Sequence, residues 1–466
     1  MTAPGISVSG GAGGIEADLT DLATLARGST GLAEELALTS ARCHPVLVDP
    51  DLLASALLDP AGVARIEAAL LEALDGPGGL TVLAARFAAR AVGLQAAAAA
   101  YEAADRALAE LADDLEWAAG FCWPAAVGGL LVRGVARAAG DPTGAAVDVA
   151  VLLEDPERWL TEHPGLVDDV MGALPGVASH LGVLTGGLTG RWLGGGDVGV
   201  AARRLGRLWP DGSPVVTPLP AEVSGPAVVA PRGIDDLLGS LEVCARRSGA
   251  GPDTIAVRVV TRADGGTAYV VDIPGTADWN APLGPVNPET HDLGTNVRVL
   301  GGEATTRQRA IAEALRRAGA GPADPVMLVG HSQGGMVAAQ AAADAGTADF
   351  DFDVRSVVTV GSPIARADVP PSVQVLALEN LYDVVPQLDS RANDDSPNVT
   401  TVTFEGQHGS IGDNHGIGTA YRPAARAVDA SDDPSLAAFR AGAAPFLVRP
   451  GEEATVTVHS YEIGRR

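Results

Sequence analysis

The chain has 466 residues, more than one ordinary hydrophobic core accommodates, so two domains are expected. Apolar residues make up 47% of it, a share typical of globular proteins. Its 58 acidic residues against 32 basic ones give a formal net charge of −26, and no local basic patch interrupts that balance. Such a chain repels phosphate backbones, so nucleic-acid binding is not expected.

Three cysteines, Cys43, Cys122 and Cys244, lie far apart and form no C-x-x-C pair. That spacing predicts neither a zinc site nor a disulfide framework, and buried free thiols are the simpler interpretation. No other part of the sequence implies a metal or an organic cofactor.

The first residues, MTAPGISVSGGAGGIEADL, contain neither a basic start nor an apolar stretch, so no standard secretory signal peptide is predicted. The chain is therefore expected either in the cytoplasm or exported by a route that needs no such signal. Residues 117–132 and 170–190 are uncharged, but Pro124, Pro175 and several glycines interrupt them. Buried helices that pack through small residues are favoured there over a membrane span.

Residues 1–205 are predicted to form an all-α domain. Apolar residues recur at helical spacing over 15–36, with RGSTG (27–31) as a candidate break, and again over 63–74. Residues 80–116 are rich in alanine and contain no proline, so one helix ~50 Å long is expected there. A bundle or helical hairpin accommodates such elements.

A proline-rich stretch, WPDGSPVVTPLPAEVSGPAVVAPRG (209–233), separates two unlike halves. Because proline lacks a donor and restricts the residue before it, residues 206–235 are predicted to be an extended linker. In residues 236–466, strand-like runs alternate with helical patterns, which predicts an α/β domain with a doubly wound, mostly parallel sheet. The expected strands are 254–261 and 267–275 as a hairpin, then 326–330, 354–361, 373–380 and 399–406, with a helix at 303–318.

Ser332 stands between Gly330 and Gly334 in VMLVGHSQGGMVAAQ (326–340), where an apolar strand ends and a helix rich in glycine and alanine begins. A serine on such a turn is held clear of the sheet at positive φ, and the glycines let strand and helix cross without Cβ clashes. The helix N-terminus directs amide donors at a developing oxyanion. Ser332 is therefore the predicted nucleophile.

An acid follows Ser332 in the order that this chemistry requires on an α/β sheet. Asp383 comes three residues after the expected strand 373–380 and is the predicted acid. A Val-Pro turn beyond it is expected to hold the carboxylate at the edge of the sheet. Asp389 is the reserve candidate.

The predicted general base is one of two histidines in QHGSIGDNHGIGTAY, which follows the expected strand 399–406. His415 is preferred over His408, because about ten residues of loop give it the reach to return over the serine. His459 lies in an alternating strand pattern and is expected to be structural.

The turn Pro274-Gly275-Thr276 ends an earlier strand and exposes backbone amides. The Thr276 N–H, with its hydroxyl as a further donor, is predicted to form an oxyanion hole with the N–H of Gln333. The segment 279–302 follows and is a candidate lid or substrate loop.

On these residues, the segment from about 254 to 428 resembles an α/β-hydrolase of the lipase/esterase type. The HGGG oxyanion motif of many esterases is replaced here by Pro-Gly-Thr. The resemblance implies a serine hydrolase for lipid or other acyl esters, in which an ester acylates the serine, the alcohol leaves and water frees the enzyme. It implies no metal and no organic cofactor.

Two alternatives stay open at this point. An acyltransferase uses the same triad but replaces water by an alcohol. A non-catalytic secreted interaction protein on a hydrolase scaffold belongs to another class, although a scaffold has no need of serine, acid and histidine in order.

Tyr101 and Asp105 in YEAAD form a Tyr-x-x-x-Asp pattern. It resembles the export signal of helical-hairpin substrates of the actinobacterial type VII secretion route, so that machinery is a candidate partner. The Trp-x-Gly turn expected before the signal is absent, since Trp192-Leu193-Gly194 comes about ninety residues after it. A core contact on an amphipathic helix is the alternative interpretation of Tyr101.

Overall fold

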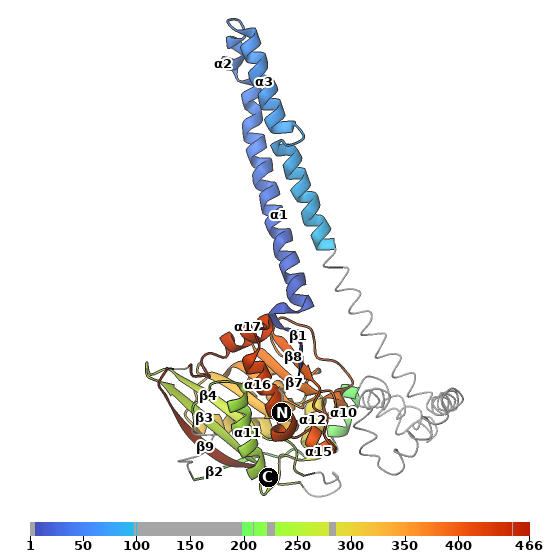
Figure 1. The fold of residues 1–466 in the computed structure, drawn as a ribbon, viewed down its shortest axis with the longest axis vertical. Coiled ribbons are helices and arrows are strands. Elements are labelled where there is room, and N and C mark those ends of the chain that lie inside the picture. Colours follow the sequence, from blue (N-terminus) through green and yellow to red (C-terminus); the bar gives the residue numbers. More distant parts are fainter. Residues whose placement is uncertain are drawn as a thin grey trace, which may run out of the picture. The chain divides into compact units, whose positions relative to one another are not determined.

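The computed structural model describes residues 5–96, 99, 198–207, 209–220, 229–278, 286–449 and 451–466, without the side chains of residues 15–20. Its contacts group the chain into two compact units, one of residues 15–111 and the other of residues 1–14 together with 112–466. The described part of the first unit is helical, and the second is built on a nine-stranded sheet (Figure 1).

The helical unit is a hairpin in which two consecutive helices, over residues 60–75 and 80–96, return beside α1 (Figure 1). The Ser40 and Thr81 hydroxyl oxygens lie 2.9 Å apart, and the His44 ring lies 3.1 Å from the Asp75 carboxylate. These contacts hold the end of α3 and the start of the helix over 80–96 against the end of α1. The elements are α1 (Ile15–Cys43), η2 (His44–Val48), α2 (Pro50–Ser55), α3 (Pro60–Asp75) and a helix over residues 80–96.

The predicted helices at 15–36 and 63–74 are present, but the candidate break at RGSTG (27–31) is not, because α1 continues through it. A glycine inside a helix costs about 1 kcal/mol relative to alanine, so two of them do not stop a helix of 29 residues. The export-signal residues Tyr101 and Asp105 lie outside the described part of the chain.

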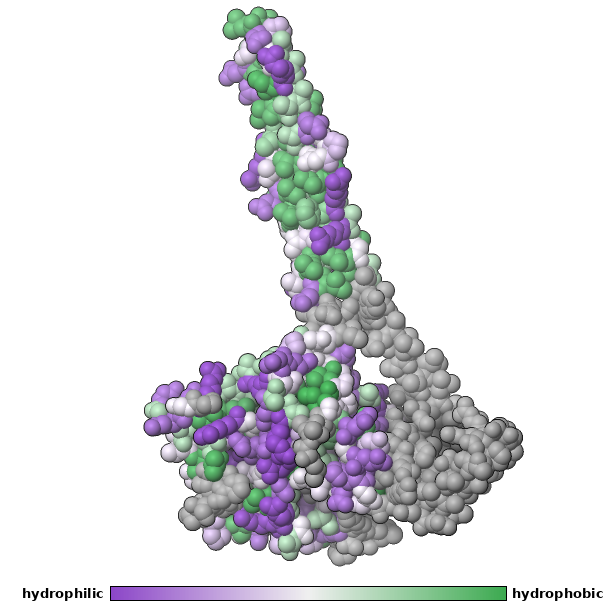
Figure 2. Space-filling view, viewed as in Figure 1, coloured by the Kyte–Doolittle hydropathy of each residue, from purple (hydrophilic) through white to green (hydrophobic). Residues whose placement is uncertain are grey.

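Apolar side chains stay exposed along this hairpin, as the green areas in Figure 2 show for one face. The large ones are Leu25, Leu32, Leu38, Val46, Val48, Leu53, Leu57, Leu58, Ile66, Leu71 and Val92. By length and composition alone, the helical stretch Pro60–Ala96 is apolar enough to cross a membrane, a criterion that core helices of soluble proteins also meet. Two paired helices bury one seam each, so part of each apolar stripe stays outside the contact.

The sheet of the second unit has the strand order β1-β8-β7-β6-β5-β4-β3-β9-β2. Neighbouring strands from β4 to β8 are parallel, and the remaining pairs are antiparallel. The sheet is therefore mixed around a parallel centre. Its strands are β1 (Ile6–Gly10), β2 (Pro214–Pro218), β3 (Thr254–Arg262), β4 (Thr267–Ile273), β5 (Pro325–His331), β6 (Asp353–Val360), β7 (Gln374–Asn380), β8 (Val399–Phe404) and β9 (Ala454–Arg465).

Helices cover both faces of the sheet, which confirms the predicted doubly wound α/β arrangement. Leu328 of β5 belongs to a core with α13 and α14, whereas the next residue, Val329, belongs to a core with α11, α16 and α17. The described helices of this unit are α10 (Val198–Gly206), α11 (Ile234–Gly249), α12 (Leu293–Leu300), α13 (Thr306–Arg317), α14 (Gln333–Ala343), α15 (Ile411–Asn414), α16 (Arg422–Ala430) and α17 (Pro434–Gly442).

Both edge strands come from segments outside the α/β domain predicted at 236–466. Strand β1 pairs with β8, and β2, inside the proline-rich segment, pairs with β9. The boundaries predicted at 205 and 235 therefore do not delimit the sheet. Proline cannot donate to a strand ladder and fits only an edge strand, and Pro214 and Pro218 stand at the two ends of β2. Those prolines are why the sequence pattern indicated a linker.

The carboxyl ends of the central parallel strands meet at one edge of the sheet. His331 at the end of β5 pairs with Val360 at the end of β6, and Val360 pairs with Leu378 of β7. Residues that follow these strand ends therefore lie near one another. The turn with Ser332 and the loop with Asp383 both begin there.

Candidate active site

Ser332 stands on a tight turn between β5 and α14. Its φ of 55° and ψ of −125° lie outside the regions that residues with a Cβ ordinarily adopt. The Ser332 N–H donates to the Val360 carbonyl at 3.0 Å, which ties the turn to β6. A strained and tethered turn holds the serine side chain in one direction at the end of the strand.

Both glycines of the motif are required by close contacts. A Cβ on Gly334 would lie 2.0 Å from the carbonyl oxygen of Ile273, and a Cβ on Gly330 would lie 2.3 Å from that of Gly334. Real Cβ atoms essentially never approach another atom within 3.0 Å. The two glycines thus let the end of β4, the turn and α14 pack together.

Asp383 and His415 form a hydrogen-bonded pair at the same edge of the sheet. His415 Nδ1 lies 2.7 Å from Asp383 Oδ2, and the carboxylate is fully buried while the imidazole is 18% exposed. The other carboxylate oxygen accepts the Val385 N–H at 3.0 Å. Because Nδ1 faces the carboxylate, Nε2 is the nitrogen left to accept a proton from a nucleophile.

A second donor, the Tyr421 hydroxyl, lies 2.6 Å from the same oxygen, Asp383 Oδ2. Tyr421 ends the π-helical turn η5 (Ile417–Tyr421), which follows the histidine loop. Gly361, at φ 59°, closes over the pair, since a Cβ there would lie 2.8 Å from Asp383 Oδ2 and 3.0 Å from His415 Cε1. Only glycine fits at that position.

His331, the residue before Ser332, contacts His415. Their ring centroids are 4.3 Å apart, and His331 Nε2 lies 2.8 Å from the His415 carbonyl oxygen. Desolvation and, after it, the neighbouring His415 lower the pKa of His331 to about 3. The His331 ring is therefore neutral at neutral pH, donates to that carbonyl, and joins the serine turn to the histidine loop.

The other predicted candidates make different contacts. The His408 backbone N–H donates to the Asn414 side chain at 2.6 Å, and His459 lies within β9. The Asp389 carboxylate accepts the Ala365 N–H at 2.8 Å. Among the described candidates for acid and base, the structure brings together Asp383 and His415.

The predicted oxyanion stretch passes beside Ser332. A Cβ on Gly275 would lie 2.9 Å from the Cβ of Ser332. Thr276 follows, and its hydroxyl contacts the Asn296 side chain of α12, with Asn296 Nδ2 at 2.9 Å and Oδ1 at 3.2 Å. The other predicted donor, Gln333, is the first residue of α14, so its backbone N–H belongs to the positive end of that helix.

The Gln333 side chain is buried and bonded at both ends. Its Oε1 accepts from Arg307 of α13 at 2.6 Å, and its Nε2 donates to the Asp292 carbonyl at 2.7 Å. Contacts with α13 and with the residue before α12 therefore fix the first residue of α14.

Arg307 is itself fully buried and pairs with Asp253 at 2.9 Å. Asp253 also accepts the Thr290 hydroxyl and lies 3.3 Å from His291 Nδ1. Burial raises the pKa of Asp253, but Arg307 and His291 outweigh it, so the net shift is downward. The carboxylate is therefore charged and paired at neutral pH.

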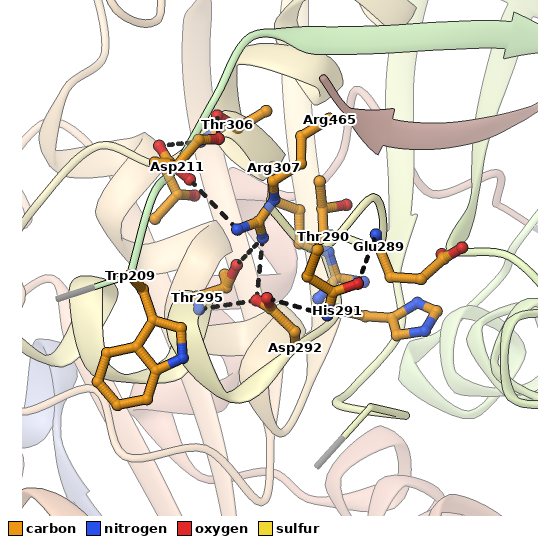
Figure 3. Close-up of polar contacts among 12 residues, drawn as sticks. Trp209, Asp211, Glu289, Thr290, His291, Asp292, Thr295, Thr306, Arg307 and Arg465 are labelled. Carbon is orange, nitrogen blue, oxygen red and sulfur yellow. Dashed lines mark hydrogen bonds and ion pairs between the residues drawn. The ribbon is translucent and has the colours of Figure 1, made fainter. Parts of the chain in front are cut away.

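The segment 279–302, a candidate lid or substrate loop, is not a single loop, because α12 lies within it. Asp292 caps α12 by accepting the Thr295 N–H at 3.0 Å, and the buried Arg465 of β9 donates to the same oxygen at 2.9 Å (Figure 3). Residues 279–285 lie outside the described residues. The start of α12, in the middle of this segment, is thus anchored to the last strand of the sheet.

Three residues that sequence reasoning did not single out contribute to this site. Tyr421 contacts Asp383, Arg307 holds Gln333, and His331 holds the loop of His415. Of these three, only His331 could have been found from the sequence, because it adjoins Ser332. A tyrosine or an arginine in an amphipathic helix forms no motif, and its role depends on tertiary contacts.

Residues 291–422 match the family model described as a PGAP1-like alpha/beta domain. The C-terminal half has an α/β-hydrolase-like fold. The matched range includes the predicted nucleophile, acid and base, whereas Thr276 precedes it. No curated protein and no solved structure matches the chain. The family match therefore supports an esterase/lipase-type hydrolase in general terms.

Proposed function

We propose that the chain is a serine hydrolase that cleaves carboxylic esters through an acyl-enzyme intermediate. The observation that carries this proposal is the buried Asp383–His415 pair at the same sheet edge as a serine held at φ 55°. A protein that uses this fold only as a scaffold gains nothing from burying a carboxylate against an imidazole and straining a serine at the same sheet edge.

In the proposed reaction, Ser332 Oγ attacks the ester carbonyl carbon while His415 Nε2 takes its proton. Asp383 keeps the Nδ1 proton in place and stabilises the imidazolium. The tetrahedral intermediate collapses when His415 returns the proton to the departing alcohol. Water, deprotonated by His415, then attacks the acyl-serine, and His415 returns that proton to Ser332 Oγ as the carboxylic acid leaves.

The proposed oxyanion hole consists of the backbone N–H groups of Thr276 and Gln333. Each donor of this kind contributes about 2.7–4 kcal/mol to the stability of the transition state. The contacts of Asn296 with Thr276 and of Arg307 with Gln333 support the proposal, because donors must be held before charge develops. The proposed substrates are lipid or other acyl esters, and the steps require no cofactor.

A fluorophosphonate probe tests this proposal, because it reacts only with an activated serine. The wild-type protein is expected to be labelled at Ser332 and to hydrolyse members of a panel of acyl esters of increasing chain length. His415→Ala removes the base and is expected to abolish labelling and hydrolysis. His408→Ala is the matched control, and we expect it to keep at least about a tenth of the activity.

Peptide mapping of the adduct and ester assays on folded variants check this prediction. The opposite pattern for the two histidines would assign the base to His408. A wild-type protein that takes no label, or takes it on another serine, would reject the proposed function.

A further inference from the structure

Two side chains contact one oxygen of the proposed catalytic acid. His415 Nδ1 and the Tyr421 hydroxyl lie 2.7 Å and 2.6 Å from Asp383 Oδ2. The Tyr421 oxygen also accepts the Asn380 N–H at 3.3 Å, so its single proton is left for the carboxylate. The phenol and the imidazole thus share the negative charge of the same oxygen.

The surrounding structure holds Tyr421 in this position. The residue is fully buried, and its ring packs edge-on against Phe404 with centroids 5.3 Å apart. A Cβ on Gly361 would lie 2.9 Å from its hydroxyl, so the backbone passes close to the phenol. Because η5 follows the histidine loop directly, Tyr421 and His415 are positioned by one short segment.

We propose that Tyr421 is a positioning residue that orients the Asp383 carboxylate toward His415 and limits how strongly that carboxylate attracts the imidazole proton. The inference rests on the function proposed above. A hydrogen bond to a carboxylate stabilises its charged form, so loss of the hydroxyl makes Asp383 more basic and His415 harder to deprotonate. Burial and then Asp383 raise the pKa of Tyr421 well above its ordinary value, so the phenol keeps its proton.

Other titratable groups near the Asp383–His415 pair determine which control variants the pH experiment needs. Desolvation raises the pKa of Glu379 to about 7, with Asp389 and Asp383 adding to the shift and a bond from Asn393 opposing it. Glu379 therefore titrates in the same range as an imidazole, and its ionisation must be separated from that of His415. His331 stays neutral across that range, because its pKa is lowered to about 3.

The test is Tyr421→Phe, which removes the hydroxyl and keeps the ring. The pKa of His415 is expected to rise by about 0.5–1 unit, and the acid limb of the kcat/KM profile moves to higher pH by the same amount. The plateau of kcat/KM falls by less than about tenfold. The shift persists in a Glu379→Gln background. Tyr269→Phe, a buried tyrosine at the amino end of β4, is the matched control and moves neither quantity.

Histidine NMR titration measures the His415 pKa directly, with His415→Gln to assign its signal among the eight histidines. Replacing Tyr421 alone by 3-fluorotyrosine, a more acidic phenol and a stronger donor, is expected to move that pKa downward. A lower plateau with an unchanged His415 pKa in Tyr421→Phe would show a merely structural role and overturn the inference.

Probe labelling and the NMR measurement together distinguish failure of the serine-hydrolase proposal from failure of the proposed role of Tyr421. A wild-type protein that takes no probe refutes the serine-hydrolase function and with it this role of Tyr421. An active, labelled enzyme whose His415 pKa is indifferent to both changes at Tyr421 refutes the inference alone.

Discussion

Replacing Ser332 by alanine is expected to lower kcat for ester hydrolysis by about 10⁴- to 10⁶-fold. Nucleophile, base and acid act as a unit, so without the serine only the oxyanion hole and substrate binding remain to assist attack by water. KM is expected to change little, since the hydroxyl contributes to the transition state rather than to binding. Steady-state kinetics on purified variants with a chromogenic ester check this prediction.

Ser362→Ala is the matched control for that substitution. Ser362 is buried, follows β6 at the same edge of the sheet, and donates to the Val360 carbonyl at 3.0 Å. Its loss removes one ordinary hydrogen bond and is expected to change kcat by less than about tenfold. If Ser332→Ala kept activity comparable to that of Ser362→Ala, Ser332 would not be the nucleophile.

Arg307→Met is expected to destabilise the sheet unit by about 3–5 kcal/mol. The substitution leaves the buried Asp253 carboxylate without its cation and the Gln333 side chain without its donor. Leaving one member of a buried ion pair unpaired is costly, because the remaining charge stays desolvated. Urea unfolding followed by circular dichroism and tryptophan fluorescence measures the change.

Arg316→Met on the same helix is the control, since its side chain is 55% exposed and its ion pair with Glu313 lies at the surface. That change is expected to stay within about 0.5 kcal/mol. Equal unfolding midpoints for the two variants would contradict the claim that the buried Arg307–Asp253 ion pair stabilises the fold.

The loss of unfolding free energy caused by Arg307→Met also depends on pH. The pKa of Asp253 is lowered in the folded protein, so its ionisation favours folding above the unfolded value of about 3.9. That contribution to stability is lost as the pH falls through the lower pKa that Asp253 has in the folded protein. The difference between wild type and Arg307→Met is therefore expected to narrow in acid, where a protonated Asp253 needs no cation.

The turn that carries Ser332, the proposed nucleophile, could be predicted from the sequence because its requirements are local. A strand, a turn at positive φ and a helix follow one another within fifteen residues, and Gly330 and Gly334 mark the places where a Cβ would collide. The alternation of strands and helices after residue 254 likewise predicted the layers of the α/β half. Periodicity and turn chemistry act between near neighbours, so they can be read along the chain.

The order of acid and base along the chain reduced the candidates to two aspartates and two histidines but did not decide between them. Asp383 and Asp389 both follow β7, and His408 and His415 both follow β8. The preference for Asp383 and His415 used loop reach, but their contact depends on how two loops fold back over one sheet edge. The contact between Asp383 and His415 is a property of tertiary structure, which the order of residues in the sequence allows but does not determine.

Length, composition and strand–helix alternation determined the class of fold, and the Gly-x-Ser-x-Gly turn predicted the nucleophile. The alternation and the turn reflect contacts within a few residues, so the sequence carries them. Tertiary structure alone decided that β1 and β2 complete the sheet, that Arg307 holds Gln333, and that Tyr421 contacts the acid. The partners in these contacts lie from 26 to nearly 400 residues apart in sequence. Edge pairing, buried ion pairs and shared hydrogen bonds stabilise the protein only when such distant segments meet, so no local pattern in the chain predicts them.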